Sequence, residues 1–184
     1  NNLRMLRWIS QTILNVLGWK ILGEPSNELN KKLYIVVPHT SSMDFFIGML
    51  VKSAKNIKVS FLGKKALFFP PLGWFLTYVG IVPVKKNSNQ INEIINLFKS
   101  KDVMSYGLAP EGTRSKVDNL RSGFYHIAHG AGVPLIMITF DFGNKIVTFR
   151  EPYHVSDDKE KDMAYIEDYY KGVVGCRKKR SFRT

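Results

Sequence analysis

Cysteine is almost absent from this chain, since Cys176 is the one cysteine among 184 residues. A single cysteine can form no internal disulfide, and it cannot supply the several thiolates of a cysteine-based zinc site. Acidic residues are also few, because 15 Asp and Glu stand against 27 Lys and Arg, a formal net charge of +12. Such a balance favours a polyanionic partner, which here means nucleic acid, an anionic membrane surface or phosphorylated substrates.

Motifs of several enzyme classes are missing as well. The chain has no Gly-x-Ser-x-Gly elbow, which counts against a serine hydrolase, and no phosphate-binding loop or dinucleotide-binding glycine motif. His126 and His129 have a spacing that can hold a metal, but no nearby carboxylate or cysteine completes a site. Cys176 has no matching histidine, so a thiol nucleophile is not expected. We therefore expect neither a metal nor a cofactor.

The residues that are present are typical of a folded protein, with 45% hydrophobic and 12% aromatic residues. Apolar runs of strand length alternate with segments of helical periodicity, which predicts one α/β domain whose mixed, largely buried β-sheet is flanked by helices. Strands are expected at 33–38, 57–62, 79–84, 103–109, 133–140 and 145–150. Helices are expected at 42–54, 72–78, 88–100, 120–131 and 159–171.

Residues 3–22 are predicted to form an amphipathic helix at the N-terminus. One side is apolar and aromatic and the other carries Arg4, Arg7 and Lys20, which is typical of a membrane-interface helix and equally of a core-packing one. Charges spread through the apolar stretch do not fit a cleavable signal. The chain is thus divided into an interfacial helix at 1–24, a central domain at 25–175 and a basic tail at 176–184.

Two further segments bear on membranes. Residues 66–84 contain no charge, but Pro70 and Pro71 would break a helix, so a short helix and a strand are expected there and not a membrane span. The tail at 176–184 is dense in Arg and Lys. We expect it to be solvated or, alternatively, to anchor the protein electrostatically to anionic lipid.

A first candidate for chemistry is His39, which follows the strand at 33–38, with Asp44 five residues later. Strand ends are where α/β proteins usually place reactive groups. A neutral imidazole can accept a proton from a hydroxyl when a carboxylate fixes its tautomer. The pair can touch if His39 lies in the strand-to-helix turn and Asp44 in the first helical turn. Alternatively, Asp44 only caps the helix and His39 is structural.

A second candidate is Pro110-Glu-Gly-Thr-Arg-Ser115, directly after the strand at 103–109. Arg114 can bind a phosphate with two parallel hydrogen bonds, and Gly112 lets backbone N–H groups approach an anion. The alternative is a surface turn with an incidental arginine.

Together, these blocks resemble the glycerolipid acyltransferases of the lysophosphatidate (1-acylglycerol-3-phosphate) acyltransferase type. In chain order the blocks are His39…Asp44, Gly80-Ile-Val-Pro-Val-Lys-Lys86, Glu111-Gly-Thr-Arg-Ser115 and Val133-Pro-Leu-Ile136. The second block departs from the family pattern, because it ends in Lys86 where the family usually has Arg, and Pro83-Val84 replaces Phe-Ile. The resemblance makes 25–175 the expected acyltransferase domain.

The resemblance implies that His39 is the general base and that Asp44 orients it. The residues implied to hold the acceptor's polar head are Lys86, Glu111, Gly112, Thr113, Arg114 and Ser115. The implied reaction moves a fatty acyl group from acyl-CoA or acyl-carrier protein to a lysophospholipid hydroxyl, with 1-acylglycerol-3-phosphate as the first candidate acceptor. Because lysine lacks the planar fork of arginine, a non-phosphate lyso-aminolipid acceptor stays open as an alternative.

The partners implied are an anionic membrane surface, a lyso-lipid acceptor and an acyl thioester donor, with the protein associated with the cytoplasmic face of a membrane. From the charge alone, a basic nucleic-acid-binding domain is an alternative of a different class. The chain lacks the motifs of RNA-recognition and zinc-finger modules, and its apolar segments at 3–22 and 66–84 suit lipid better. We therefore expect no nucleic-acid partner.

Overall fold

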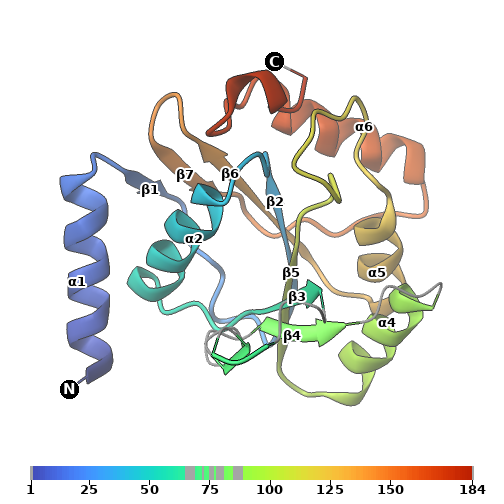
Figure 1. The fold of residues 1–184 in the computed structure, drawn as a ribbon. Helices are drawn as coiled ribbons and strands as arrows, with labels where there is room; N and C mark the ends of the chain where they lie inside the picture. Colours follow the sequence, from blue (N-terminus) through green and yellow to red (C-terminus); the bar gives the residue numbers. More distant parts are fainter. Residues whose placement is uncertain are drawn as a thin grey trace.

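A mixed β-sheet lies at the centre of the molecule, and helices pack on both of its faces (Figure 1). The computed structural model describes residues 2–64, 69–71, 73–74, 77, 81–84 and 89–183. Across the sheet, the seven described strands run in the order β1 (Lys20–Leu22), β7 (Ile146–Phe149), β6 (Leu135–Asp141), β2 (Lys31–Val37), β5 (Met104–Leu108), β3 (Ser60–Lys64) and β4 (Ile81–Val84). The described pairings are parallel except that of β6 with β7. The predicted single α/β domain with a mixed sheet is confirmed.

Two helical layers enclose the sheet. The described helices are α1 (Asn2–Val16), α2 (Met43–Ala54), α4 (Gln90–Ser100), α5 (Gly123–Ala131), α6 (Lys159–Tyr170) and the short 3-10 helix η2 (Lys178–Arg180). Alternate residues of β2 face opposite layers: Leu33 and Ile35 pack with α4, α5 and α6, whereas Tyr34 packs with α1 and α2. Burial on both faces explains why residues 33–37 of β2 and 135–138 of β6 form continuous apolar runs.

The parallel pairing of β2 with β5 brings two distant sequence motifs together. Ile35 of β2 is in register with Leu108 of β5, so the carboxyl ends of both strands lie at one edge of the sheet. The turn after β2 carries His39, and the turn after β5 carries Glu111. Reactive groups in open α/β sheets lie at such an edge.

The N-terminal helix is shorter than predicted. Helix α1 ends at Val16, and residues 20–22, expected as helix, form β1 beside β7. The helix stops because Gly18 adopts a left-handed φ of +78°, its N–H bonds to Asn15 O at 3.0 Å, and the N–H of Trp19 bonds to Leu14 O at 2.8 Å. This is a Schellman C-cap, which turns the chain and directs Trp19 into the core against Phe142.

Helix α1 lies along α2 and leaves an apolar face outside. Nε of Arg7 donates to Ala54 O at 3.4 Å, and Leu14 is completely buried. Large apolar side chains of α1 remain exposed: Met5, Trp8, Ile9, Ile13 and Val16. None of the helices in the described part of the chain is long and apolar enough to cross a membrane.

The C-terminal segment is not the solvated tail that its composition suggests. Ser181 and Phe182 are completely buried, and Phe182 belongs to the core on the α4–α6 side of the sheet. Oγ of Ser181 accepts the N–H of Gly175 at 2.9 Å. The expectation of a solvated tail is wrong because Phe182 packs in the core and Ser181 forms a buried hydrogen bond, although cations surround both in the sequence.

The remaining predictions differ in extent or cannot be compared. The strand expected at 57–62 begins at Ser60, and the helix expected at 120–131 begins at Gly123. The strand expected at 79–84 is observed as β4. Most of the helix expected at 72–78 lies outside the described residues.

Candidate active site

His39 and Asp44 meet at the carboxyl end of β2, where the strand turns into α2. Nδ1 of His39 lies 3.2 Å from Oδ2 of Asp44, with His39 in the turn and Asp44 in the first turn of the helix. The imidazole is 30% exposed and the carboxylate only 3%. The ring therefore reaches solvent on one side while its partner is fixed inside the protein.

The carboxylate of Asp44 serves two purposes at once. Its Oδ2 accepts the backbone N–H groups of Thr40 at 2.7 Å and Ser41 at 2.9 Å. Both donors precede α2, so the carboxylate fixes the turn before the helix, whereas the expected alternative is that it only caps the helix itself. The same oxygen faces His39, so the bonds from the turn also fix the carboxylate that lies against the imidazole.

The pairing with Asp44 selects one imidazole tautomer. An ionised carboxylate can only accept, so Nδ1 of neutral His39 carries the proton and Nε2 keeps its lone pair. The nearest described donor to Nε2 is Nε of Arg114, at the long distance of 3.5 Å. Arg114 is held by Ser42, whose Oγ accepts from a terminal guanidinium nitrogen at 3.1 Å. Nε2 of His39 thus makes only this long contact, and it lies next to the guanidinium of Arg114, which Ser42 holds.

Glu111 lies beneath this pair and does not face solvent. It is only 1% exposed, and its Oε2 accepts the backbone N–H of His39. Burial raises the pKa of Glu111 to about 7, against the lowering effect of the hydrogen bond from His39. Within the described residues its Oε1 has no hydrogen-bond partner. The structure therefore favours a role in holding the His39 turn over the expected contact with a head group.

The rest of the block after β5 lies at the surface. Gly112 has a φ of +64°, and a side chain there would contact the Arg121 guanidinium at 2.9 Å. Oγ1 of Thr113 accepts the N–H of Ser115 at 3.2 Å, and Arg114 and Ser115 are exposed. Arg121 is a cation of this turn that the motif alone does not reveal, because it lies beyond the matched residues.

Of the predicted site residues, the structure brings together His39, Asp44, Glu111 and Arg114. Lys86 lies outside the described residues. The sequence reasoning missed Ser42, which holds Arg114, and Thr40, whose N–H bonds to Asp44. Both lie inside the His-x4-Asp motif, so the turn geometry could have indicated them as contacts.

A second histidine-carboxylate pair contradicts the expectation that His129 has no carboxylate nearby. Nε2 of His129 lies 2.8 Å from Oδ1 of Asp157, and its ring stacks on Tyr125. Asp157 is fully exposed, so solvent screens this pair strongly. Separation along the chain hid the partner from a search for local ligands.

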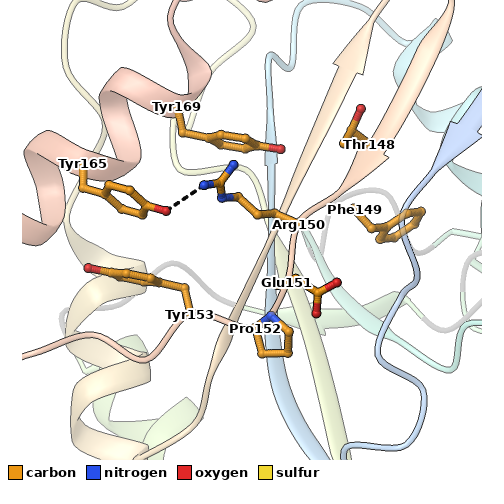
Figure 2. A pocket seen from close by; sticks show the side chains of 8 residues that line it. All are labelled: Thr148, Phe149, Arg150, Glu151, Pro152, Tyr153, Tyr165 and Tyr169. Atoms are coloured by element: carbon orange, nitrogen blue, oxygen red, sulfur yellow. Dashed lines mark hydrogen bonds between the residues drawn. The ribbon is translucent and has the colours of Figure 1, made fainter.

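A cavity of about 510 Å³ lies away from this site, between β7 and α6 (Figure 2). The guanidinium of Arg150 lies 5.8 Å from the ring centre of Tyr165 and 4.8 Å from that of Tyr169. It also donates to the Tyr165 hydroxyl at 3.0 Å. The guanidinium of Arg150 therefore already occupies the faces of the Tyr165 and Tyr169 rings, which could otherwise bind a cationic ligand.

Another cavity, of about 790 Å³, opens at the amino ends of β2, β3 and β5, the edge opposite His39. Its lysines are Lys32, Lys52, Lys58 and Lys101. Helices α2 and α4 both end here, and lysine side chains near a helix C-terminus interact favourably with its carbonyl groups. The helix ends account for Lys52 and Lys101, while Nζ of Lys32 donates to Leu29 O at 2.8 Å.

Comparisons with known proteins identify the family and the fold of this chain. The family model described as Acyltransferase matches residues 21–141, more than half of the chain and the region that holds His39, Asp44 and Arg114. No curated protein sequence matches significantly. The crystal structure of the 1-acyl-sn-glycerophosphate (LPA) acyltransferase PlsC from Thermotoga maritima has a similar fold, with a TM-score of 0.65 and 19% sequence identity. The match covers 91% of this chain and 76% of that chain. Because the family model matches about two thirds of its length, this chain belongs to the acyltransferase family.

Proposed function

We propose that this chain is an O-acyltransferase of the lysophosphatidate type, which moves a fatty acyl group from a thioester donor to the hydroxyl of a lysophospholipid. The observation that carries the proposal is the meeting of His39 and Arg114 at one edge of the sheet. A proton acceptor beside a fixed guanidinium suits an acceptor that carries both a hydroxyl and a phosphate.

The chemical step follows from the orientation of the imidazole. The acceptor hydroxyl donates to Nε2 of His39, which takes the proton as the oxygen attacks the thioester carbonyl. Asp44, 3.2 Å from Nδ1, stabilises the imidazolium that forms. The tetrahedral intermediate then collapses, the C–S bond breaks, and the imidazolium returns its proton to the leaving thiolate. His39 ends the cycle neutral, without a covalent acyl-enzyme.

The proposed acceptor is 1-acylglycerol-3-phosphate. Arg114 supports this choice because guanidinium binds phosphate in a planar, two-donor geometry. The Thermotoga maritima protein of similar fold is a 1-acyl-sn-glycerophosphate acyltransferase, so its acceptor is of the same kind. Lys86 is proposed as a second phosphate-binding residue. A lyso-aminolipid without the phosphate is the alternative acceptor, which an assay can separate directly.

We also propose that the protein works at the cytoplasmic face of a membrane, with acyl-CoA or acyl-carrier protein as donor. The exposed apolar residues of α1, such as Trp8 and Ile13, support contact with the acyl chains of a bilayer surface. The exposed cations Arg177, Lys178 and Lys179 support attraction to anionic lipid or to a polyanionic donor.

The test is a matrix of acceptors and donors with the wild-type protein. The acceptors are 1-acylglycerol-3-phosphate, a glycerol-based lysolipid without phosphate and a lyso-aminolipid, each with acyl-CoA and with acyl-carrier protein. Product is identified by mass. We expect acylation of the phosphate-bearing acceptor to be fastest with at least one donor. Preferred acylation of the lyso-aminolipid would replace the proposed acceptor, and no product in any combination would contradict the proposed reaction.

A further inference from the structure

The segment at residues 175–183 lies outside the region that the family model matches, yet it contacts the turn that carries His39. The backbone N–H of Arg177 donates to Oγ1 of Thr40 at 3.1 Å. Gly175 packs so closely that a side chain there would lie 2.7 Å from Cγ2 and 2.8 Å from Oγ1 of Thr40, and 2.9 Å from Cγ of Pro38. The C-terminal segment is therefore in direct contact with the turn that carries His39.

Thr40 connects this segment with the His39–Asp44 pair. The Thr40 side chain is completely buried and accepts from Arg177, while its backbone N–H donates to Oδ2 of Asp44 at 2.7 Å. The same Oδ2 lies 3.2 Å from Nδ1 of His39. A displacement of Thr40 therefore changes both an anchor of the Asp44 carboxylate and the start of α2.

The other end of the segment is anchored to the loop that follows the block at 110–115. Nε of Arg183 donates to Asp118 O at 2.7 Å, and a terminal nitrogen of the same guanidinium pairs with Glu167 at 2.8 Å. Phe182, with no exposed surface, fixes the segment in the core between these two contacts. The segment thus spans the two loops that supply His39 and Arg114.

We propose that residues 175–183 form a brace of the active site, and that Thr40 is the positioning residue through which the brace holds Asp44 and His39. The kinetic readout of this proposal rests on the acyl transfer proposed above, whereas its structural readout does not. Small displacements of a catalytic group can lower turnover by up to about a hundredfold, which sets the scale of the expected effect.

The test compares Thr40→Val, Thr40→Ser and Gly175→Ala in the full chain. Thr40→Val keeps the shape but removes the acceptor for Arg177, so kcat should fall by about tenfold to a hundredfold with little change in KM. Thr40→Ser keeps the acceptor and should lose less. Gly175→Ala should resemble Thr40→Val, because its added methyl must displace both Thr40 and Pro38.

The matched control is Gly123→Ala, whose added methyl would meet only Cδ1 of Ile91, at 3.8 Å. It should keep wild-type kcat, which separates the brace from a general intolerance of added methyl groups. The structural readout is the nitrogen NMR spectrum of His39 without substrate. Thr40→Val and Gly175→Ala should shift the Nδ1 and Nε2 signals and their pH titration, whereas Gly123→Ala should not.

Wild-type values of kcat and unchanged His39 signals in both Thr40→Val and Gly175→Ala would overturn the brace. If one of these two variants does not fold, the other decides by the same readouts, and wild-type kcat with unchanged His39 signals would overturn the proposal. If the wild-type protein transfers no acyl group, the NMR comparison alone decides the brace, while the proposed reaction fails separately.

Discussion

The backbone N–H of His39 donates to Oε2 of Glu111, so the proposed base is held from below by a buried carboxyl that follows a different strand. Parallel pairing of β2 with β5 makes this contact possible, because both residues follow the carboxyl ends of neighbouring strands. The bond fixes the main chain of His39, whereas Asp44 fixes its ring. Glu111 thus holds the backbone of His39, and Asp44 holds its imidazole.

Glu111 should make stability depend on pH. Burial raises its pKa from 4.5 to about 7, so the folded protein holds this proton over an interval in which the unfolded chain releases it. The stability contributed by protonated Glu111 is therefore lost as the pH rises through about 7. Glu111→Gln cannot titrate, so the difference in free energy of unfolding between wild type and variant should change by up to about 3 kcal/mol between pH 4.5 and pH 8. Denaturant titrations across this range measure it, and a constant difference would contradict the raised pKa.

Asp44→Asn should lower kcat by about a hundredfold or more, because the amide no longer stabilises the imidazolium of His39. It should also lower the free energy of unfolding by about 1–3 kcal/mol, since the N–H groups of Thr40 and Ser41 lose a charged acceptor. Steady-state kinetics and denaturant unfolding measure the two effects. The control is Asp168→Asn, at an exposed position of α6, which should leave both unchanged. Full activity of Asp44→Asn would remove Asp44 from the mechanism.

Arg114→Ala should raise KM for a phosphate-bearing acceptor by about tenfold or more, because the head group loses a charge-assisted hydrogen bond. Arg114→Lys should recover only part of this affinity, since an ammonium group lacks the two-donor fork. KM is measured for acceptors with and without phosphate, and Lys159→Ala on α6 serves as a control remote in sequence. An equal change for both acceptors would argue against phosphate binding by Arg114.

Substitution on the outer face of α1 should weaken the proposed membrane binding without disturbing the core. Ile13→Glu replaces a side chain that is 40% exposed, and loss of its apolar contact should reduce partition to vesicles by about tenfold or more. Co-sedimentation with vesicles of phosphatidylcholine and phosphatidylglycerol measures it. Asn15→Glu adds the same charge on the polar side of α1 and should have a smaller effect. Equal losses in the two variants would point to charge alone and against insertion of the apolar face.

The sheet and the His39–Asp44 pair could be predicted from sequence because local signals suffice for both. Strand and helix periodicity follow from neighbouring residues, and a five-residue spacing across a strand-to-helix turn limits how the two side chains meet. The role of Glu111 could not be predicted, because its burial depends on the pairing of β2 with β5. Motif matching alone suggested a contact with the acceptor head group and could not indicate the contact with the His39 N–H.

The two ends of the chain show a different limit. The apolar pattern continues past Val16, but the left-handed Gly18 ends α1, and β7 supplies a partner that turns the next residues into a strand. The run of cations at the C-terminus suggests a solvated tail, yet the burial of Phe182 depends on a core assembled from distant residues. Tertiary contacts decide both cases, and no local window contains them.

The most direct test of the central claim is the turnover of His39→Ala beside that of His126→Ala, an exposed histidine of α5. Both are assayed with 1-acylglycerol-3-phosphate and the donor that the wild type uses best. His39→Ala should lose at least about a hundredfold in kcat, the scale of a general base, while its unfolding transition stays close to that of wild type. His126→Ala should retain wild-type turnover. Near wild-type turnover of a folded His39→Ala protein would contradict the assignment of His39 as the base.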